Sequence, residues 1–233
     1  TPSEERRHDL VGLGFRPEQV WVVPPVALGQ EAFEEPSRPV LQREPLIVWL
    51  GKVRRYKCVH HAVEAMAHVA RQEPAARLVI AGRRDDPGYE RMLRQMIVDL
   101  GLAGRVDFQF DLSETAKFHL LGRARTLVVP SPVEGFGIVI LEANACGTPA
   151  VVSQGVPVEA VRQGYNGLRV PFGDTTALAE ALLRVLADGP LAESLSGNAA
   201  LHARSFSKPS IQRQLEEIIQ RAVCTPTLAP VSV

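Results

Sequence analysis

The chain has 233 residues, which suffices for one large domain and part of a second. Lysine plus arginine and aspartate plus glutamate number 26 each, so no net charge attracts the chain to nucleic acid or to anionic lipid. The longest stretch without a charged residue, 143–158, contains glycines and prolines and is shorter than the ~20 apolar residues of a membrane span. Three cysteines without a C-x-x-C pair favour a reducing compartment. The composition therefore predicts a cytoplasmic globular protein without a transmembrane segment or signal peptide.

The first 45 residues contain two short elements and a proline-rich stretch. A capped helix is expected over residues 3–13, because two glutamates occupy its first turn and Gly14 follows its end. A strand is expected over residues 20–23. Five prolines and little apolar periodicity between residues 24 and 45 then predict a linker, so we expect a domain boundary there.

Beyond this linker, apolar runs alternate with helical patterns. A helix over residues 89–100 is indicated by apolar side chains at i, i+3, i+4 and i+7, and Asp174 is expected to cap another helix. A last helix is expected over residues 209–223. The expected strands cover residues 46–50, 77–81, 106–110, 126–129, 150–152 and 168–170. Strands that are apolar on both faces and alternate with amphipathic helices predict an α/β fold with a doubly wound parallel sheet.

Two loops after expected strands carry unusual residues, and open parallel sheets bind ligands at the carboxyl ends of their strands. Four cations fall within residues 52–57. In the second loop, residues 130–137, Gly135 and Gly137 allow backbone amides to approach a ligand closely, and a helix begins directly afterwards. These features predict an anion site, where Lys52 and Lys57 would neutralise a diphosphate.

Two glutamates complete this hypothesis. Glu142 lies among apolar residues, where a buried carboxylate needs donors, and a ribose diol would supply two. Glu134 lies on the loop, where it could accept hydrogen bonds from the hydroxyls of a group attached beyond the phosphates. Simpler interpretations remain open: the glycines could serve a tight turn, the cations could form a solvated face, Glu142 could form a salt bridge, and Glu134 could be an ordinary surface residue.

Other catalytic classes lack support in the sequence. There is no Ser-His-Asp signature, no P-loop and no Asp-x-Asp pair that would hold a divalent ion on a diphosphate. His60, His61 and His68 do not predict a metal site, because no acidic or cysteine ligand was found at a compatible spacing. Cys146 is expected to be a small core residue. Neutralisation by lysines, without a metal, is therefore the expectation.

Residues 130–149, with the sequence PSPVEGFGIVILEANACGTP, resemble the retaining glycosyltransferases of family four, which have the two-domain GT-B fold. Their signature is two glutamates separated by seven residues and followed by Gly-Thr-Pro. Residues 51–57 resemble the phosphate loop of that family, Gly-Arg-x-x-x-x-Lys, with Lys52 in place of the arginine, and Cys58 replaces its usual glycine. The resemblance extends over about residues 5–223.

The resemblance implies roles for individual residues. The catalytic set would be Glu134, Lys57 and Lys52, with the lysines on the phosphates. Glu142 would hold the ribose, the Leu112 region the base, and Arg54 would share the duty of Lys52, which lacks the bidentate fork of arginine. The remaining donor-binding residues would be Gly51, Gly135, Phe136, Gly137 and Ile138.

The resemblance also implies a function and a domain plan. A hexosyl group would move from a UDP-sugar or GDP-sugar to a sugar, lipid or other acceptor with retention, without metal or further cofactor. Residues 46–207 would be the Rossmann-like donor domain, and a missing N-terminal domain would bind most of the acceptor. Residues 1–23 would be its remnant, 24–45 the linker, 208–223 a helix that packs back on it, and 224–233 a disordered tail. In the hinge, Pro25 and Val26 replace the usual Asn-Gly.

Two alternatives stay open. The chain could bind a nucleotide sugar without transferring it, or it could be a sugar-nucleotide epimerase or phosphorylase with the same fold.

Overall fold

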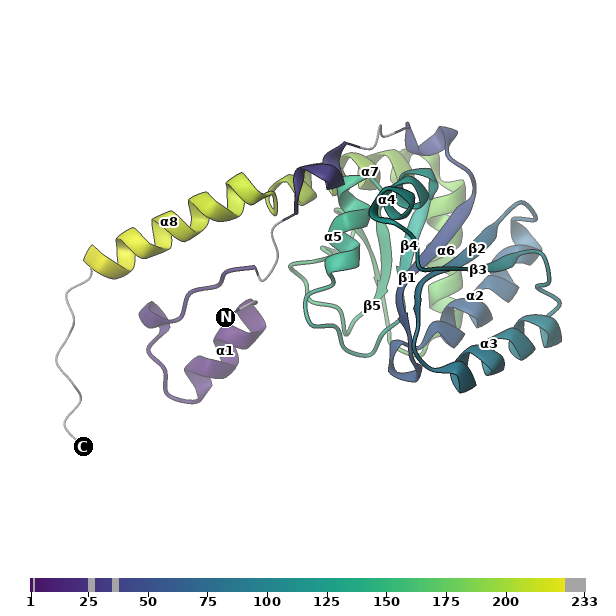
Figure 1. The fold of residues 1–233 in the computed structure, drawn as a ribbon, viewed down its shortest axis with the longest axis horizontal. Coiled ribbons are helices and arrows are strands. Elements are labelled where there is room, and N and C mark those ends of the chain that lie inside the picture. Colours follow the sequence, from purple (N-terminus) through teal and green to yellow (C-terminus); the bar gives the residue numbers. More distant parts are fainter. Residues whose placement is uncertain (2, 25–27, 35–37, 225–233) are drawn as a thin grey trace.

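The computed structural model describes residues 1, 3–24, 28–34 and 38–224 (Figure 1). Six strands form one sheet: β1 Leu46–Val53, β2 Arg77–Arg84, β3 Val106–Phe110, β4 Thr126–Val129, β5 Ala150–Ser153 and β6 Gly167–Val170. The helices are α1 Glu4–Gly12, α2 Val59–Gln72, α3 Pro87–Asp99, α4 Glu114–Arg123, α5 Ile138–Ala145, α6 Thr175–Ala187, α7 Gly189–Arg204 and α8 Lys208–Cys224. Every predicted strand from residue 46 onward is confirmed.

The sheet is parallel throughout, and its strand order is β3-β2-β1-β4-β5-β6. The chain therefore builds outward from β1 to one edge and then returns to β4, beside β1, to build toward the other edge. This confirms the doubly wound sheet. The reversal lies between β1 and β4, and the crevice at such a switch point is where ligands bind in open α/β sheets.

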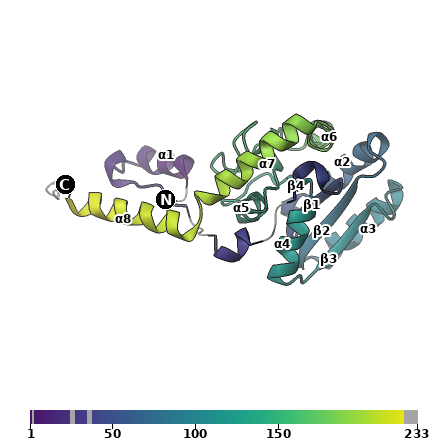
Figure 2. The same cartoon turned by 90° about the horizontal axis from the view of Figure 1, so that it is seen from above.

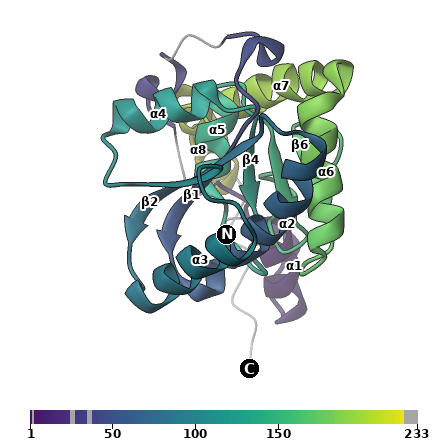
Figure 3. The ribbon, with the colours of Figure 1, turned by 90° about the vertical axis from the view of Figure 1, so that its right-hand side faces the viewer.

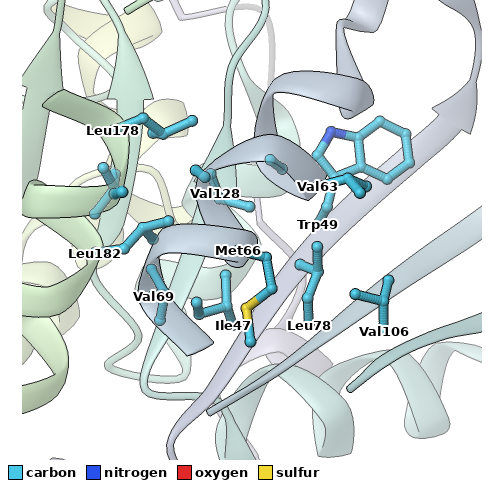
Figure 4. Packing of buried hydrophobic residues seen from close by; sticks show 14 of the residues in the cluster. Ile47, Trp49, Val63, Met66, Val69, Leu78, Val106, Val128, Leu178 and Leu182 are labelled. Atoms are coloured by element: carbon cyan, nitrogen blue, oxygen red, sulfur yellow. The ribbon is translucent and has the colours of Figure 1, made fainter. Parts of the chain in front are cut away.

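Two hydrophobic clusters cover the two faces of the sheet, because alternate residues of each strand point in opposite directions. On one face, β-strand side chains such as Ile47 and Leu78 pack against α2, α3 and α6. Figure 4 shows Trp49, Met66 and Leu182 in this cluster. On the other face, side chains such as Val48 pack against α4 and α5. Figure 3 shows helices on both sides of the strands.

Helix starts follow local capping chemistry. The N-caps whose side chains accept an amide three residues later are Ser3, Asp86, Ser113, Asp174 and Asp188. The expected cap at Asp174 is thereby confirmed. The bounds of α1, α3 and α8 confirm the helices expected over residues 3–13, 89–100 and 209–223 to within a few residues. Cys146 is 1% exposed, as expected for a core residue.

The strand expected over residues 20–23 is wrong. This segment belongs to no strand of the sheet. Its backbone is instead held by local contacts: the amide of Val23 donates to the carbonyl of Thr1, and the side chain of Arg7 donates to the carbonyl of Val20. A strand needs a neighbouring strand to pair its backbone groups, and the part of the chain described here places none beside this segment.

The linker expected over residues 24–45 packs against the sheet domain for much of its length. Leu28, Ala32 and Val40 are buried, and Leu28 and Ala32 belong to the cluster on the α4–α5 face. The buried Arg43 donates to the carbonyls of Ala124 and Cys146 and to Thr148. Residues 28–34 and 38–45 are therefore part of the sheet domain. Single apolar residues between prolines carry no periodic signal, so only the folded chain revealed their burial. Pro25 and Val26 lie outside the described residues.

The N-terminal segment lies beside α8, away from the sheet (Figures 1 and 2). A cavity of about 580 Å³ is lined by residues of both, including Trp21 and Ile218. Helix α8 is attached to the sheet domain through the buried Ile211 and a bridge between Leu28 and Ser207. Among the described residues, no helix combines the length and the hydropathy that crossing a membrane requires. Of the expected tail, residues 225–233 lie outside the described part.

Candidate functional site

A cavity of about 590 Å³ opens where the carboxyl ends of β1 and β4 lie side by side. This is the switch point of the sheet. Its walls come from the two loops that the sequence analysis singled out. They are formed by Trp49, Leu50, Gly51, Lys52, Tyr56, Lys57, Val129, Glu134, Gly135, Phe136, Gly137, Ile138 and Val139.

One wall is the turn between β4 and α5. Gly137 is the N-cap of α5 and has φ +80°, a left-handed conformation that glycine adopts without strain. No side chain caps this helix, so its first amides have no side-chain acceptor. These amides form the positive end of the helix dipole. Such a helix start attracts anions. Phe136 is buried, and its ring packs against Phe206 with centroids 5.7 Å apart.

The opposite wall brings Lys57 against Glu134. The Lys57 ammonium donates to both carboxylate oxygens, at 2.8 and 2.7 Å, and the two side chains are only 20% and 11% exposed. This ion pair joins the cation-rich loop to the glycine loop, as the anion-site hypothesis required. Lys52 lies at the end of β1, is exposed, and lines the same cavity.

Three predicted donor-binding residues do not line this cavity in the described part of the chain: Arg54, Leu112 and Glu142. Arg54 forms an ion pair with Asp85, on the loop after β2. Leu112 is partly buried against the core cluster on the α4–α5 face. Arg54 is thus paired with Asp85 and lies outside the cavity lining, so the phosphate binding that it was expected to share with Lys52 has no geometric support.

Glu142 forms the salt bridge that the sequence analysis left open as an alternative. Its Oε1 accepts from Lys117 Nζ on α4 at 2.7 Å, and the two side chains are 16% and 14% exposed. Burial raises the pKa of Glu142, and the neighbouring lysine opposes that rise. Burial alone would lower the pKa of Lys117, but the carboxylates of Glu114 and Glu142 outweigh it and raise the pKa.

A family model described as "Glycosyl transferases group 1" matches residues 31–202, which include both loops of the cavity. The chain belongs to this family. The resemblance to family-four glycosyltransferases of the GT-B fold is thereby confirmed.

Curated relatives of this chain are about twice as long as the chain itself. A D-inositol 3-phosphate glycosyltransferase of Nocardia farcinica is 30% identical over 216 residues, which are 88% of this chain and 48% of the relative. That of Actinosynnema mirum is 34% identical over 213 residues, 85% of this chain and 51% of the relative. The chain thus spans about half the length of these relatives.

Solved structures share the fold. The crystal structure of Anabaena Alr3699/HepE in complex with UDP has a TM-score of 0.81 and 22% identity, covering 94% of this chain and 62% of that one. Sucrose-phosphate synthase from Thermosynechococcus elongatus has a TM-score of 0.72 and 26% identity, covering 94% and 57%. The parallel sheet of this chain is therefore the Rossmann-like sheet of the GT-B fold.

Sequence reasoning missed several residues of the cavity: Trp49, Leu50, Tyr56, Val129 and Val139. Val129 ends β4, so its strand position was an available signal, whereas Trp49 and Leu50 lie in the middle of β1. Nothing local indicated that Lys117 would reach Glu142, because the two residues are 25 positions apart on different helices.

One group of residues of metal-ligand type corrects the sequence analysis. Cys58, His60 and His61 place ligand atoms within 4.8 Å of one another, so a cysteine does stand near the histidines. The surroundings oppose a cation, because the group lies at the N-terminus of α2 and near the positive charge of Arg55. Burial, with smaller contributions from His61 and Arg55, lowers the pKa of His60. Burial also raises the pKa of the Cys58 thiol, which disfavours the thiolate that metals bind.

Proposed function

We propose that this chain is the donor-binding part of a glycosyltransferase that moves a hexosyl group from a nucleoside diphosphate sugar to an acceptor. The observation that carries the proposal is the cavity at the switch point, where the start of α5, Lys52 and the Lys57–Glu134 pair meet. A diphosphate placed there would face unpaired amides and two ammonium groups. The UDP complexes of Anabaena Alr3699/HepE favour UDP over GDP as the first nucleotide to test.

The mechanism follows from where charge develops. When the bond between sugar and diphosphate breaks, negative charge builds on the leaving oxygen. The amides of α5 and the ammonium groups of Lys52 and Lys57 would stabilise that charge more than they stabilise the intact donor. Glu134 would accept hydrogen bonds from hydroxyls of the sugar, and Glu142 would accept hydrogen bonds from hydroxyls of the ribose. Because these cations neutralise the diphosphate, we propose transfer without a divalent ion. Retention at the anomeric carbon is the expectation carried by the family resemblance.

A second candidate is a module that binds the donor without transferring the sugar. It is favoured by one observation: the chain spans 48% of the Nocardia farcinica relative, so an acceptor wall would come from a further domain. Under either candidate, the donor site lies within this chain.

Calorimetry with UDP-glucose, UDP-N-acetylglucosamine and GDP-mannose tests the donor site. We expect at least one of them to bind, with or without EDTA. Release of the nucleoside diphosphate in the presence of candidate acceptors, D-inositol 3-phosphate among them, separates the two candidates: release by the chain alone dismisses the binding module. Absence of binding for UDP, GDP and all three sugars at millimolar concentration would overturn the proposed function.

A further inference from the structure

A partly buried charge cluster joins α4 to α5. The Lys117 ammonium lies 2.7 Å from Glu142 Oε1 and 2.6 Å from Glu114 Oε2. Lys117 and Glu142 are nearly buried, whereas Glu114 is 72% exposed. We propose that Lys117 is a positioning residue that holds the carboxylate of Glu142 for the ribose of the nucleotide. This inference rests on the proposed function, because it assumes that a nucleoside diphosphate binds at the switch point.

The two oxygens of Glu142 have different surroundings. Lys117 reaches Oε1, and within the described part of the chain no hydrogen bond is made to Oε2. The side chain keeps 16% of its surface accessible, so Oε2 is open to a donor from outside. Glu142 also follows Ile138 and Val139, which line the cavity, by four and three residues, so all three share one face of α5. One oxygen is thus anchored by Lys117, and the other has no hydrogen-bond partner among the described residues.

The alternative is that the ion pair only fastens α4 to α5. The charged groups that face Glu142 in the described residues are Lys117 and Glu114, both on α4. Removal of Lys117 would leave Glu142 with a carboxylate neighbour and no cation. The side chain would then protonate more readily or turn away, and a ribose hydroxyl would lose a charged acceptor. A fastening role predicts lost stability, whereas a positioning role also predicts a loss confined to ribose recognition.

Discrimination between ribose and deoxyribose separates the two roles. We would titrate the 233-residue chain with UDP, 2′-deoxy-UDP and 3′-deoxy-UDP, or with the guanosine series if UDP does not bind. A hydrogen bond to a charged group corresponds to about tenfold in affinity, so wild type should prefer UDP over at least one deoxy analogue by about that factor. In Lys117→Met the preference should fall to within about twofold. Lys117→Arg should restore part of it.

Glu114→Gln is the matched control, because it removes the exposed partner of Lys117 and leaves the Lys117–Glu142 contact. It should keep the wild-type preference.

The pH dependence of UDP affinity is a second readout. Loss of the Lys117 cation raises the pKa of the Glu142 carboxylate. As the solution is acidified, the affinity of Lys117→Met for UDP should therefore begin to fall at a higher pH than that of wild type.

The outcomes are distinct. If wild type binds neither UDP nor GDP, the proposed function fails, and this inference with it. If wild type prefers UDP and Lys117→Met keeps the same preference, the positioning role is overturned while the proposed function stands. Wild type that binds UDP and both deoxy analogues equally would also overturn it. Should Lys117→Met fail to fold, as circular dichroism would show, Glu142→Gln and Lys117→Arg carry the same comparison: Glu142→Gln should reduce the preference, and an unchanged preference would overturn the inference.

Discussion

Lys57 and Glu134 come from loops 77 residues apart and meet inside the cavity as a two-oxygen ion pair. Each is bound by its partner in the free protein, so an incoming diphosphate competes with Glu134 for the ammonium of Lys57. The local charge of the site is thereby balanced before the donor arrives. A bound diphosphate would draw Lys57 away and leave Glu134 free to accept sugar hydroxyls.

The Lys57–Glu134 ion pair predicts two separate effects of a Lys57 substitution, one on UDP affinity and one on the free energy of unfolding. Lys57→Ala should weaken UDP binding about tenfold or more, because a charge-assisted hydrogen bond is lost. It should also destabilise the fold by about 1–3 kcal/mol, because it leaves the mostly buried Glu134 unpaired. Calorimetry measures the first effect and denaturant unfolding the second.

Glu134→Gln provides the control for this prediction. The double variant Lys57→Ala with Glu134→Gln should regain much of the lost stability, because no buried carboxylate remains unpaired, and should still bind UDP weakly. UDP affinity of Lys57→Ala within twofold of wild type would show that the ammonium does not contact the diphosphate.

At the scale of elements, helix α5 depends on Gly137 for its start. The residue has φ +80°, and a Cβ there would lie 2.8 Å from Ile140 Cδ1. Gly135, two residues earlier, is exposed, lacks a positive φ, and has no atom within 4 Å of a built Cβ. The two glycines of the loop therefore have different physical roles, although they look equivalent in the sequence.

Alanine at each position tests this difference. Gly137→Ala should destabilise the protein by about 1–2 kcal/mol, because alanine is strained in the left-handed region. For a chain of this size that lowers Tm by roughly 2–4 °C per kcal/mol. Gly135→Ala should keep stability within about 0.5 kcal/mol but weaken UDP binding, since a methyl group would stand where a ligand approaches the backbone. Equal stability of the two variants would contradict this assignment.

At the scale of the whole molecule, the donor cavity and α8 are separate features. The cavity is lined by residues between 49 and 139, whereas α8 lines the other cavity, with the N-terminal segment. Leu215, Ile219 and Val223 form an exposed apolar stripe on α8, at helical spacing. The anchor of this helix, Ile211, is buried in the sheet domain.

Truncation after Gln214 tests this separation. The shortened chain retains Ile211 and should bind UDP with an affinity within twofold of that of the whole chain, because no residue of the donor cavity is removed. Calorimetry and the rise of Tm with UDP measure the comparison, since a ligand that binds only the folded state stabilises it. Lost UDP binding in a truncated chain that remains folded would mean that α8 contributes to the donor site.

The sequence by itself determined the elements whose signals are local. Apolar spacing and capping residues specified α3 and the start of α6, and apolar runs specified the six strands, because periodicity and caps act within a few residues. The loop motif likewise specified that Gly51–Lys57 and residues 130–137 would meet, since parallel strands end at the same edge of the sheet.

Tertiary structure alone decided the rest. The expected strand over residues 20–23 failed because pairing depends on a neighbour that no local pattern reports. The buried Leu28, Ala32 and Arg43 were hidden between prolines because their partners, such as Thr148, lie far along the chain. The partners of Glu134 and Glu142 were settled in the same way: a buried carboxylate requires a cation, but only the packing of α2's entry loop and of α4 decided that Lys57 and Lys117 would supply it.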